Sequence, residues 1–411
     1  MKKIFFMLFV FLFFNGYAAT LEEFLDKSLK DYPDILIKER DIKTQQIEVK
    51  RVEGDFMPKL NFSSSYSISD PNDSDSTKTF YNELKLSYNI FSGFSSTNNL
   101  KIAKYTLNLA ENSSNLMAKT IKKNVSSAYF DALTSYKLIK FYEELLKSSQ
   151  KTYENIKSKF EVGRSLKIDV LKALTEVKKY ESKLFEQKSI FKNYLIILGQ
   201  YTGEQYDDNI SLETDFYEPQ IDNDPTSYFK KAESNNLELK SYNEKIALSE
   251  KEISKARSTL LPSIDIYGSI YNNNVDRGRS STDTTVASAG ILLSWNIFNG
   301  NKDTLGIEKQ KISYYNTIDE KRRTVLTLKK DLFTTHNKIK TAKENLTYLK
   351  SLLEVSSENY KITNEAYELG KATLIEVIKA KDELILATIE YTNNSNTLIQ
   401  NYISLQYLVG E

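Results

Sequence analysis

Cysteine is absent from this 411-residue chain, and histidine occurs only once, at His336. Without cysteine there can be no disulfide, no thiolate nucleophile, no cysteine-bound zinc and no lipid-modified cysteine. One histidine cannot form a multi-histidine metal site, and we interpret His336 as a packing or surface residue rather than a catalyst. The 56 Lys and Arg residues balance 55 Asp and Glu residues, so the chain has no net positive field to attract nucleic acid.

Long apolar runs are missing after the first residues. Lys2 and Lys3 precede eleven apolar residues at 4–14, and the small residues Gly16 and Ala18 follow. This pattern is typical of a secretory signal peptide, and the run is too short for a spanning helix. We therefore predict that residues 1–18 are a signal peptide, that the protein is exported, and that no transmembrane helix follows.

Glycine and proline are scarce, with 13 and 6 residues, and they are distributed unevenly. The stretch 94–162 has neither, and 301–369 has only Gly306. Because each such residue inside a helix costs about 1 kcal/mol for glycine and about 3 for proline, each stretch can be one helix roughly 100 Å long. Apolar and small residues recur there in steps of four and three, the pattern typical of coiled coils.

Short phrases occur twice in the chain. LSYNIFSGF at 86–94 returns as LSWNIFNGN at 293–301, and VGRSLKIDVLKA at 162–173 returns as LGKATLIEVIKA at 369–380, both 207 residues later. FMPKLNF at 56–62 has a similar counterpart, LLPSIDI, 204 residues later. This order predicts an internal repeat, with copies at 19–224 and 225–411. In each copy a glycine stop predicts a helical hairpin, with tips at 163–166 and 370–374.

Strict alternation of apolar and polar residues follows Pro58 and Pro262. It predicts β-hairpins at about 59–91 and about 263–298, the second with a polar loop at Asn272–Thr284. Strands of this length can cross a bilayer, and the aromatic-bearing alternation is typical of outer-membrane barrels. A soluble sheet with one wet face is the alternative. Since four strands cannot close a barrel and open edges are excluded from lipid, spanning hairpins would require several copies; three would supply twelve strands.

These features, in this order, resemble the TolC-like outer-membrane efflux proteins. The resemblance covers essentially the whole mature chain, and includes the proline-to-strand junctions, the strand-to-helix phrases and the tips FEVGRSLKIDVLKA (160–173) and YELGKATLIEVIKA (367–380). It implies a mainly α protein with a transmembrane β-barrel portion, internally duplicated, with four β-strands and long coiled-coil helices per protomer. It further implies a homotrimer with a 12-stranded barrel in outer-membrane lipid and an α-helical tunnel in the periplasm.

The resemblance implies a function without catalysis or cofactors. Such a protein is the exit duct of a tripartite efflux or type I secretion system, and its helix tips meet a periplasmic adaptor and an inner-membrane transporter of the RND or ABC type. The cargo is left open. The tips give the candidate docking residues Gly163, Arg164, Ser165, Leu166, Gly370, Lys371, Ala372, Thr373 and Leu374.

The resemblance also implies a tunnel gate near the second tip. Asp169, Tyr367 and Glu376 match the family's gate positions, whereas Ala372 replaces an arginine of the best-known member and Lys379 replaces its second acid. Glu376 and Lys379 lie three residues apart and can pair on one helix face. We hypothesise a ring of mixed charge, a weaker block by cations and a latch without the arginine. Ordinary solvated helix charges are the alternative.

Two rival functions follow from the same residues. A periplasmic coiled-coil scaffold or adaptor without a pore explains the helices and the signal peptide, but not two aromatic-bearing hairpins at equivalent points. An enzyme finds little support in a chain with one histidine and no cysteine, phosphate-binding glycine loop or carboxylate cluster near a loop.

Overall fold

A computed structural model describes residues 18–70, 76–213, 215–278 and 280–411, so the predicted signal peptide lies outside the described residues apart from its last position. The predicted long helices are confirmed. Helices α3 (Ser95–Glu161) and α7 (Lys302–Glu368) have 67 residues each, and α4 (Lys167–Thr202) and α8 (Leu374–Val409) have 36 each. Corresponding helices start 207 residues apart, so the duplication extends to every helix boundary in this part of the chain.

The shorter helices that precede the strands are duplicated as well. Helices α1 (Leu21–Asp31) and α2 (Pro33–Glu53) correspond to α5 (Pro225–Asn235) and α6 (Leu237–Arg257), 204 residues later. The sequence predicts shorter helices before the strands of each copy, at 21–53 with a break near Pro33 and at 228–260. The break near Pro33 is confirmed. The expectation of one unbroken helix at 228–260 is wrong, because Asn236 leaves the helical conformation and its side-chain amide donates a hydrogen bond to the Leu408 carbonyl.

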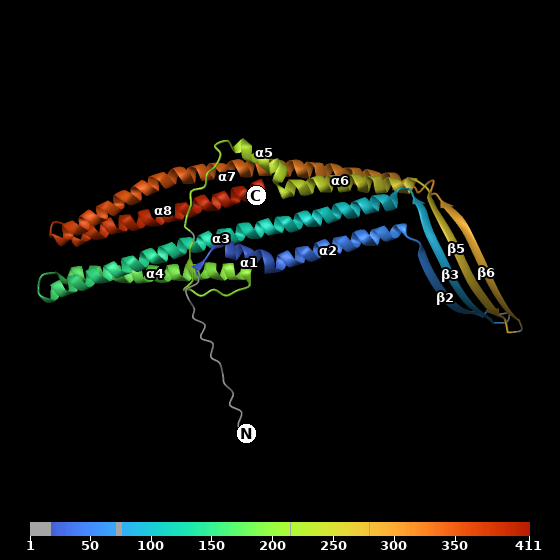
Figure 1. The fold of residues 1–411 in the computed structure, drawn as a ribbon, viewed down its shortest axis with the longest axis horizontal. Helices are drawn as coiled ribbons and strands as arrows, with labels where there is room; N and C mark the ends of the chain where they lie inside the picture. Colours follow the sequence, from blue (N-terminus) through green and yellow to red (C-terminus); the bar gives the residue numbers. More distant parts are fainter. Residues whose placement is uncertain (1–17, 71–75, 214, 279) are drawn as a thin grey trace, which may run out of the picture. The chain divides into compact units, whose positions relative to one another are not determined.

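The chain forms two compact units, and each unit takes segments from both repeats. The tip unit comprises the chain up to Leu36, Met117–Asn236 and Leu328–Glu411, and the sheet unit comprises Ile37–Leu116 and Leu237–Thr327. Within the tip unit, α3 and α4 lie side by side as one hairpin, and α7 and α8 as a second (Figure 1). None of the described helices is both long and apolar enough to span a membrane.

The tip unit is held together by buried side chains at the predicted helical period. The steps of four and three predict coiled-coil positions from Ile121 to Phe160 on α3 and, 207 residues later, from Leu328 to Tyr367 on α7. Of these positions only Phe160 is exposed, and the others are at least partly buried. One cluster packs Phe24 of α1 against Tyr129, with Leu133, Leu198 and Ile399 around them. His336 is buried, and its Nε2 lies 2.9 Å from the Asp222 carbonyl oxygen, as the packing interpretation of this residue predicts.

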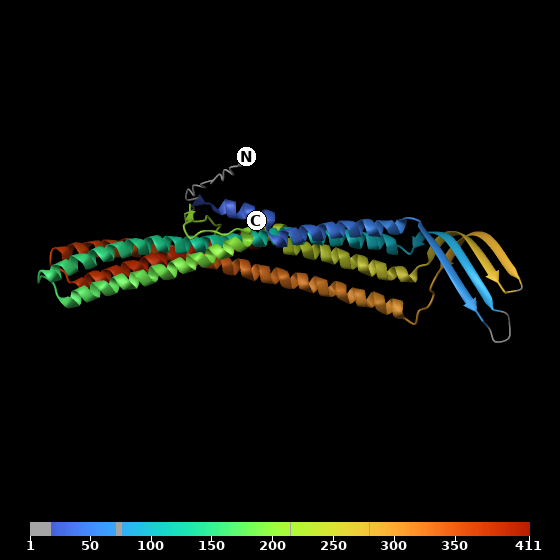
Figure 2. The same ribbon diagram turned by 90° about the horizontal axis from the view of Figure 1, so that it is seen from below.

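The sheet unit contains one antiparallel sheet in the order β2-β3-β5-β6 (Figure 2). Its strands are β2 (Lys59–Ser69), β3 (Thr77–Ser92), β5 (Ser263–Asp276) and β6 (Ser281–Ser294). The two hairpins are joined side by side, because β3 of the first pairs with β5 of the second along almost their whole length. The tip unit carries a separate parallel pair, β1 (Ala18–Ala19) with β4 (Ser211–Leu212).

The second hairpin differs from its prediction at two places. Most of the expected loop at Asn272–Thr284 is strand, and Asn272 donates hydrogen bonds across the ladder to Asp283 and Thr285. Polar residues on both faces hid this extension from a search for alternation. At the other end, β6 stops at Ser294 rather than near 298, and the Trp295 indole N–H donates to the Leu260 carbonyl.

Candidate functional site

One face of the sheet is apolar across all four strands. In the register, Phe62 opposes Leu84, Leu84 opposes Ile270, and Ile266 opposes Ile291. These side chains stay exposed in the protomer, for example Phe62 at 69% and Ile291 at 72%. The exposed members of this face are Leu60, Phe62, Tyr66, Ile68, Phe80, Leu84, Leu86, Tyr88, Ile266, Ile270, Ile291 and Leu293. A patch this large calls for a second apolar phase, either another protein surface or lipid.

The opposite face of the sheet is polar and internally hydrogen-bonded. The Asn89 side-chain amide donates to Asp265 Oδ1 at 2.7 Å, and the Ser269 and Ser288 hydroxyls lie 2.9 Å apart across the strands. Lys85 lies over the Tyr267 ring, 5.7 Å from its centre. Side chains of this kind suit contact with water, so the two faces of the sheet fit two different solvents.

The sheet has open edges. Within the described residues, β2 pairs only with β3 and β6 pairs only with β5, so one side of each outer strand has no backbone partner. Exposed edges of long strands invite pairing with another chain, and in lipid they are not tolerated. The protomer therefore presents an incomplete sheet.

The repeated phrases at 86–94 and 293–301 lie where the sheet meets the long helices. Each contains two successive residues with positive φ: Gly93 at 61° and Phe94 at 68°, then Gly300 at 56° and Asn301 at 63°. Two left-handed residues in a row form a tight local bend between the strand and the helix that follows. A Cβ on Gly93 would lie 2.6 Å from the Ser258 carbonyl oxygen, whereas one on Gly300 would meet nothing within 4 Å.

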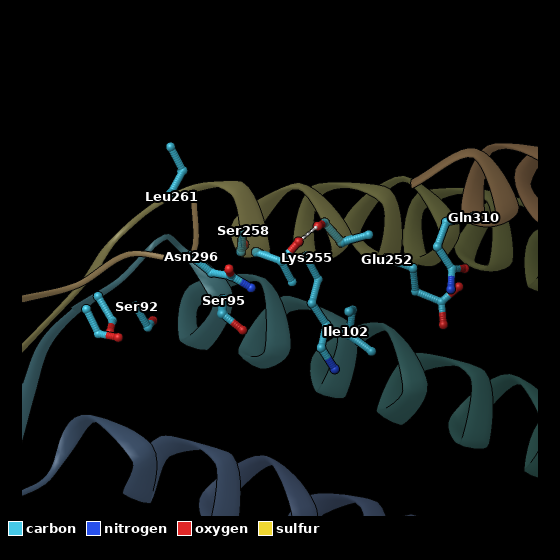
Figure 3. A pocket seen from close by; sticks show the side chains of 13 residues that line it. Ser92, Ser95, Ile102, Glu252, Lys255, Ser258, Leu261, Asn296 and Gln310 are labelled. Atoms are coloured by element: carbon cyan, nitrogen blue, oxygen red, sulfur yellow. Dashed lines mark hydrogen bonds between the residues drawn. The ribbon is translucent and has the colours of Figure 1, made fainter. Parts of the chain in front are cut away.

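A pocket of about 570 Å³ lies beside the first junction (Figure 3). Ser92 and Ser95 from the junction and Lys255 from α6 line it, together with Asn296 and Gln310 from the second repeat. The junction is therefore tightly packed at Gly93 and hollow next to it, with mainly polar side chains in the hollow.

The hairpin tips have the glycine geometry that the sequence predicts. Gly163 and Gly370 both have φ of 74°, and each turn is closed by a backbone hydrogen bond to the preceding helix. Val162, Leu166 and Leu369 are exposed at 69%, 67% and 72%. The apolar residues of the tips are thus available for contact with another surface.

Among the candidate docking residues, the sequence predicts that Leu166 near Arg164 and Leu374 near Lys371 each offer an apolar side chain beside a basic one, and for Leu374 this prediction is wrong. Leu374 is only 7% exposed, because it packs with Ile156, Val170 and Ala173 in the cluster that joins the two hairpins of one protomer. The exposed apolar residue of the second tip is Leu369, which the sequence search did not select.

The predicted gate residues lie at the same end of the tip unit. Tyr367 packs against the tip cluster; burial raises its pKa, and the nearby Asp169 carboxylate raises it further. Glu376 forms a capping box with Thr373: its Oε2 accepts from the Thr373 N–H at 2.7 Å and from the Thr373 hydroxyl at 2.9 Å. These two hydrogen bonds lower the pKa of Glu376, whereas the exposed Lys379 contributes least.

The expected pairing of Glu376 with Lys379 is not observed. Among the described residues no ion pair joins them, because the Glu376 carboxylate accepts hydrogen bonds from the Thr373 N–H and hydroxyl at the helix N-terminus. The structure thus brings Asp169 and Tyr367 together and places Glu376 in a structural cap.

The comparisons with known proteins agree with this architecture. The family model described as "Outer membrane efflux protein" matches residues 24–204 and 229–411, which is most of both repeats. The chain belongs to the outer membrane efflux protein family. Outer membrane protein TolC of Vibrio cholerae is 21% identical over 406 residues, which is 96% of this chain and 91% of that protein.

Other relatives of the efflux family extend the comparison. TolC of Escherichia coli is 18% identical over 71% of this chain, and the match spans 62% of that protein. The crystal structure of the Campylobacter jejuni CmeC outer membrane channel superimposes with a TM-score of 0.82 and 17% identity, covering 95% of this chain and 85% of that one. Family membership confirms the predicted duplicated fold, the outer-membrane location with periplasmic helices, and efflux as the class of function.

One buried residue of this efflux protein was missed by the sequence search. Lys381 of α8 is 6% exposed and donates a hydrogen bond to the Ser149 hydroxyl of α3 at 2.5 Å. A signal for it exists in the sequence, because Lys381 follows Leu374 and Val377 in steps of three and four, which places it on the buried stripe of α8.

Proposed function

We propose that three copies of the chain join their sheets into a closed twelve-stranded barrel in the outer membrane. The observation that carries this proposal is the single sheet with one exposed apolar face, one polar face and two free edges. Joining β6 of one copy to β2 of the next satisfies the open edges, places the apolar face against lipid and turns the polar face inward.

The number of copies follows from the size of a barrel. Four strands cannot enclose a lumen, and about eight strands leave an interior that side chains just fill. Since each copy contributes four strands, twelve is the first multiple that leaves room for a passage. Three copies are therefore the smallest assembly that conducts solutes.

The helices support assembly as well. On the part of α7 within the tip unit, Leu352, Val355 and Ile362 are exposed at 47%, 67% and 56%, and their spacings of three and seven continue a coiled-coil seam. The protomer itself leaves this second stripe uncovered. A neighbouring copy would cover it and complete a ring of helical hairpins around a tunnel.

In this assembly the protein is the exit duct of a tripartite efflux or type I secretion system. We assign the exposed tip residues Val162, Leu166 and Leu369 to docking of a periplasmic adaptor, alongside the basic residues Arg164 and Lys371. An inner-membrane transporter of the RND or ABC type would supply the energy. Replacing Leu166 and Leu369 by Ser should abolish adaptor binding while channel conductance in isolation stays unchanged; intact binding would refute the docking role.

We further assign the tunnel gate to Asp169, Tyr367, Glu376 and Lys379. Three copies of Glu376 and Lys379 form a ring of mixed charge, so divalent and trivalent cations should block current only weakly. Replacing Lys379 by Asp should create a doubly acidic ring and tighten the block. Tight block of the unmodified channel would contradict this assignment.

The absence of cysteine gives a direct test of the barrel. Within one protomer β2 and β6 are separated by two strands, roughly 14 Å, which is too far for a disulfide. One cysteine at Ser65 of β2, combined in turn with cysteines along β6, should form disulfides only between copies. A covalent trimer on a denaturing gel, together with steps of current in planar bilayers, is the expected result.

The matched control places the same β6 cysteines opposite one in the middle of the sheet, at Ser269 of β5. These pairs should cross-link within one chain, because Ser269 opposes Ser288. A protein that yields only uncrosslinked monomers from the β2–β6 pairs, and no current, would support the scaffold without a pore. No comparison favours that alternative.

A further inference from the structure

A buried lysine connects the two helical hairpins of the tip unit. Lys381 extends from α8 into the first hairpin, where its Nζ donates to the Ser149 hydroxyl of α3 at 2.5 Å. The same Nζ lies 4.8 Å from the centre of the Tyr180 ring of α4. One side chain of the second hairpin thus contacts both helices of the first.

The charged groups around Lys381 are engaged with one another. On α4, Glu176 accepts a hydrogen bond from the Tyr180 hydroxyl at 2.7 Å and lies 3.6 Å from Lys179. Lys179 also pairs with Asp382 of α8 at 2.7 Å. From α7, Tyr360 faces the same region across a cavity of about 30 Å³. Among the described residues, none forms an ion pair with Lys381.

This environment is costly for an ammonium group. Burial lowers the pKa of Lys381 to about 8 from its usual 10.5; Glu176 and Asp382 oppose this effect, and Lys179 adds to it. The group still carries its proton at neutral pH. A buried charge with one hydroxyl and one aromatic ring as partners is less stable than the same charge in water, so it weakens the packing around it.

Lys381 lies next to the tip cluster, the apolar contact of Leu374 with Ile156, Val170 and Ala173 that joins the two hairpins. The small cavity beside it is also lined by Leu374 and Val377, and Leu374 packs against Ile156 of the first hairpin. Separating α8 from α3 and α4 would hydrate Lys381 and open this cluster at the same time. The first repeat has Leu174 at the corresponding position, so the charge is confined to one of the two hairpins.

We propose that Lys381 is a positioning residue for the tunnel entrance, whose buried ammonium group biases the two hairpins of a protomer toward separation. Loss of its proton favours the packed arrangement. This inference rests on the proposed function, because the hairpin tips form an entrance only if the chain forms a tunnel.

The direction of the pH effect follows from the two protonation equilibria. A water-exposed lysine holds its proton up to about pH 10.5, whereas the packed one loses it near pH 8. Separation therefore takes up a proton between these values, and raising the pH through this window shifts the equilibrium toward packing, by about tenfold per unit for each subunit. Below pH 8 both states are protonated, and this group adds no pH dependence.

The test measures the open fraction of the full-length channel in planar bilayers from pH 6.5 to 10. The unmodified channel should close progressively above pH 8. Lys381→Met removes the charge and should hold the entrance closed at every pH, whereas Lys381→Arg stays charged and should remain open without an alkaline closing phase. Lys178→Met, an exposed lysine on α4 whose side chain is 67% accessible, is the matched control and should keep the wild-type profile.

A second readout does not depend on current. Spin labels on Val162→Cys and Leu369→Cys, one on each tip, report the separation of the hairpins in detergent-solubilised protein. The distance between labels should shorten between pH 7.5 and 10 in the parent chain but not in Lys381→Met. Equal pH profiles in parent and Lys381→Met would overturn the inference, whereas a channel without current but with this distance change would overturn only the proposed function.

Discussion

The two repeats have helices of equal length, yet the second helix of each helical hairpin, α4 in one repeat and α8 in the other, begins differently. Helix α8 starts with the capping box of Thr373 and Glu376, whereas Leu166 at the start of α4 makes no side-chain cap. Leu374 is buried at the start of α8, while the corresponding residue of α4, Lys167, is exposed. Lys381 is buried in one repeat, where Leu174 stands in the other.

This difference shows which features the duplication preserves. Glycine stops, prolines and the apolar period set the helix lengths, and these are the same in both copies. Side chains at the hairpin–hairpin contact have diverged: both tips expose apolar residues, but only the second hairpin has the capping box of Thr373 and the buried charge of Lys381. The backbone is therefore the part that the duplication preserves, and the side chains between the hairpins are the part that differs.

The largest effect is expected from placing a charge on the apolar face of the sheet, and it should be the same in the two β-hairpins. Tyr66→Arg and Ile270→Arg occupy equivalent positions on the apolar face, and each should destabilise the assembled barrel by about 2–4 kcal/mol if the residue lies near the bilayer midplane. Heat-resistant oligomers on gels and unfolding in denaturant measure the loss. Ser65→Arg and Ser269→Arg, one residue away on the polar face, are the controls. Equal losses on both faces would rule out a lipid-facing surface.

The next effect is a difference in stability between alanine substitutions at the two strand-to-helix junctions. Gly93→Ala should cost about 2–4 kcal/mol, since a left-handed alanine is strained and its Cβ collides with the Ser258 carbonyl and the Leu261 side chain. Gly300→Ala should cost only about 1–2 kcal/mol, for the strained φ alone. Free energies of unfolding of the two variants decide the matter, and equal values would mean that the junctions are packed alike.

A smaller effect concerns the N-terminal cap that α8 has and α4 lacks. Thr373→Ala should destabilise the first turn of α8 by about 1 kcal/mol because the first amides lose a side-chain acceptor. Leu166→Thr should make the start of α4 more like that of α8, with Asp169 in the third position. Hydrogen exchange of the first-turn amides should speed up in the first variant and slow down in the second; the reverse order would contradict the role of the cap.

The smallest effect is the pH dependence of this cap. Hydrogen bonds from Thr373 lower the pKa of Glu376 in the folded protein, below its ordinary value of 4.5. The stabilisation is therefore complete above about pH 4.5 and disappears as the pH falls through the lowered value. Exchange protection of the α8 first turn, followed from pH 6 to pH 3, should decline in the parent chain and stay flat in Glu376→Gln. Parallel declines in both would exclude Glu376 as the titrating group.

Much of the fold could be predicted because it depends on local rules. The glycines at 163 and 370, the break at Pro33 and the strand alternation after Pro58 each act within a few residues. The break at Asn236 was missed because it is stabilised by a hydrogen bond to the distant Leu408 carbonyl. The strand at 272–276 was missed because polar residues there pair across the ladder with polar partners.

The site followed the same division. The sequence correctly placed the tips and predicted the apolar and polar faces of the sheet, but it misjudged the burial of Leu374 and the pairing of Glu376. Burial of a residue near a hairpin tip depends on what the other hairpin brings against it, and a carboxylate three residues into a helix has two competing partners. The spacing of residues alone shows neither which hairpin surface covers Leu374 nor which partner the Glu376 carboxylate takes.

By itself, the sequence determined the duplication, the helix lengths and the two faces of the sheet, because periodicity and glycine or proline placement act along the chain. Only the tertiary structure decided that the two β-hairpins share one sheet, and which helices cover Leu374 and Lys381 on the periodic stripe of α8. These features depend on contacts between residues up to 232 positions apart, and such contacts are set by packing rather than by local conformational preference.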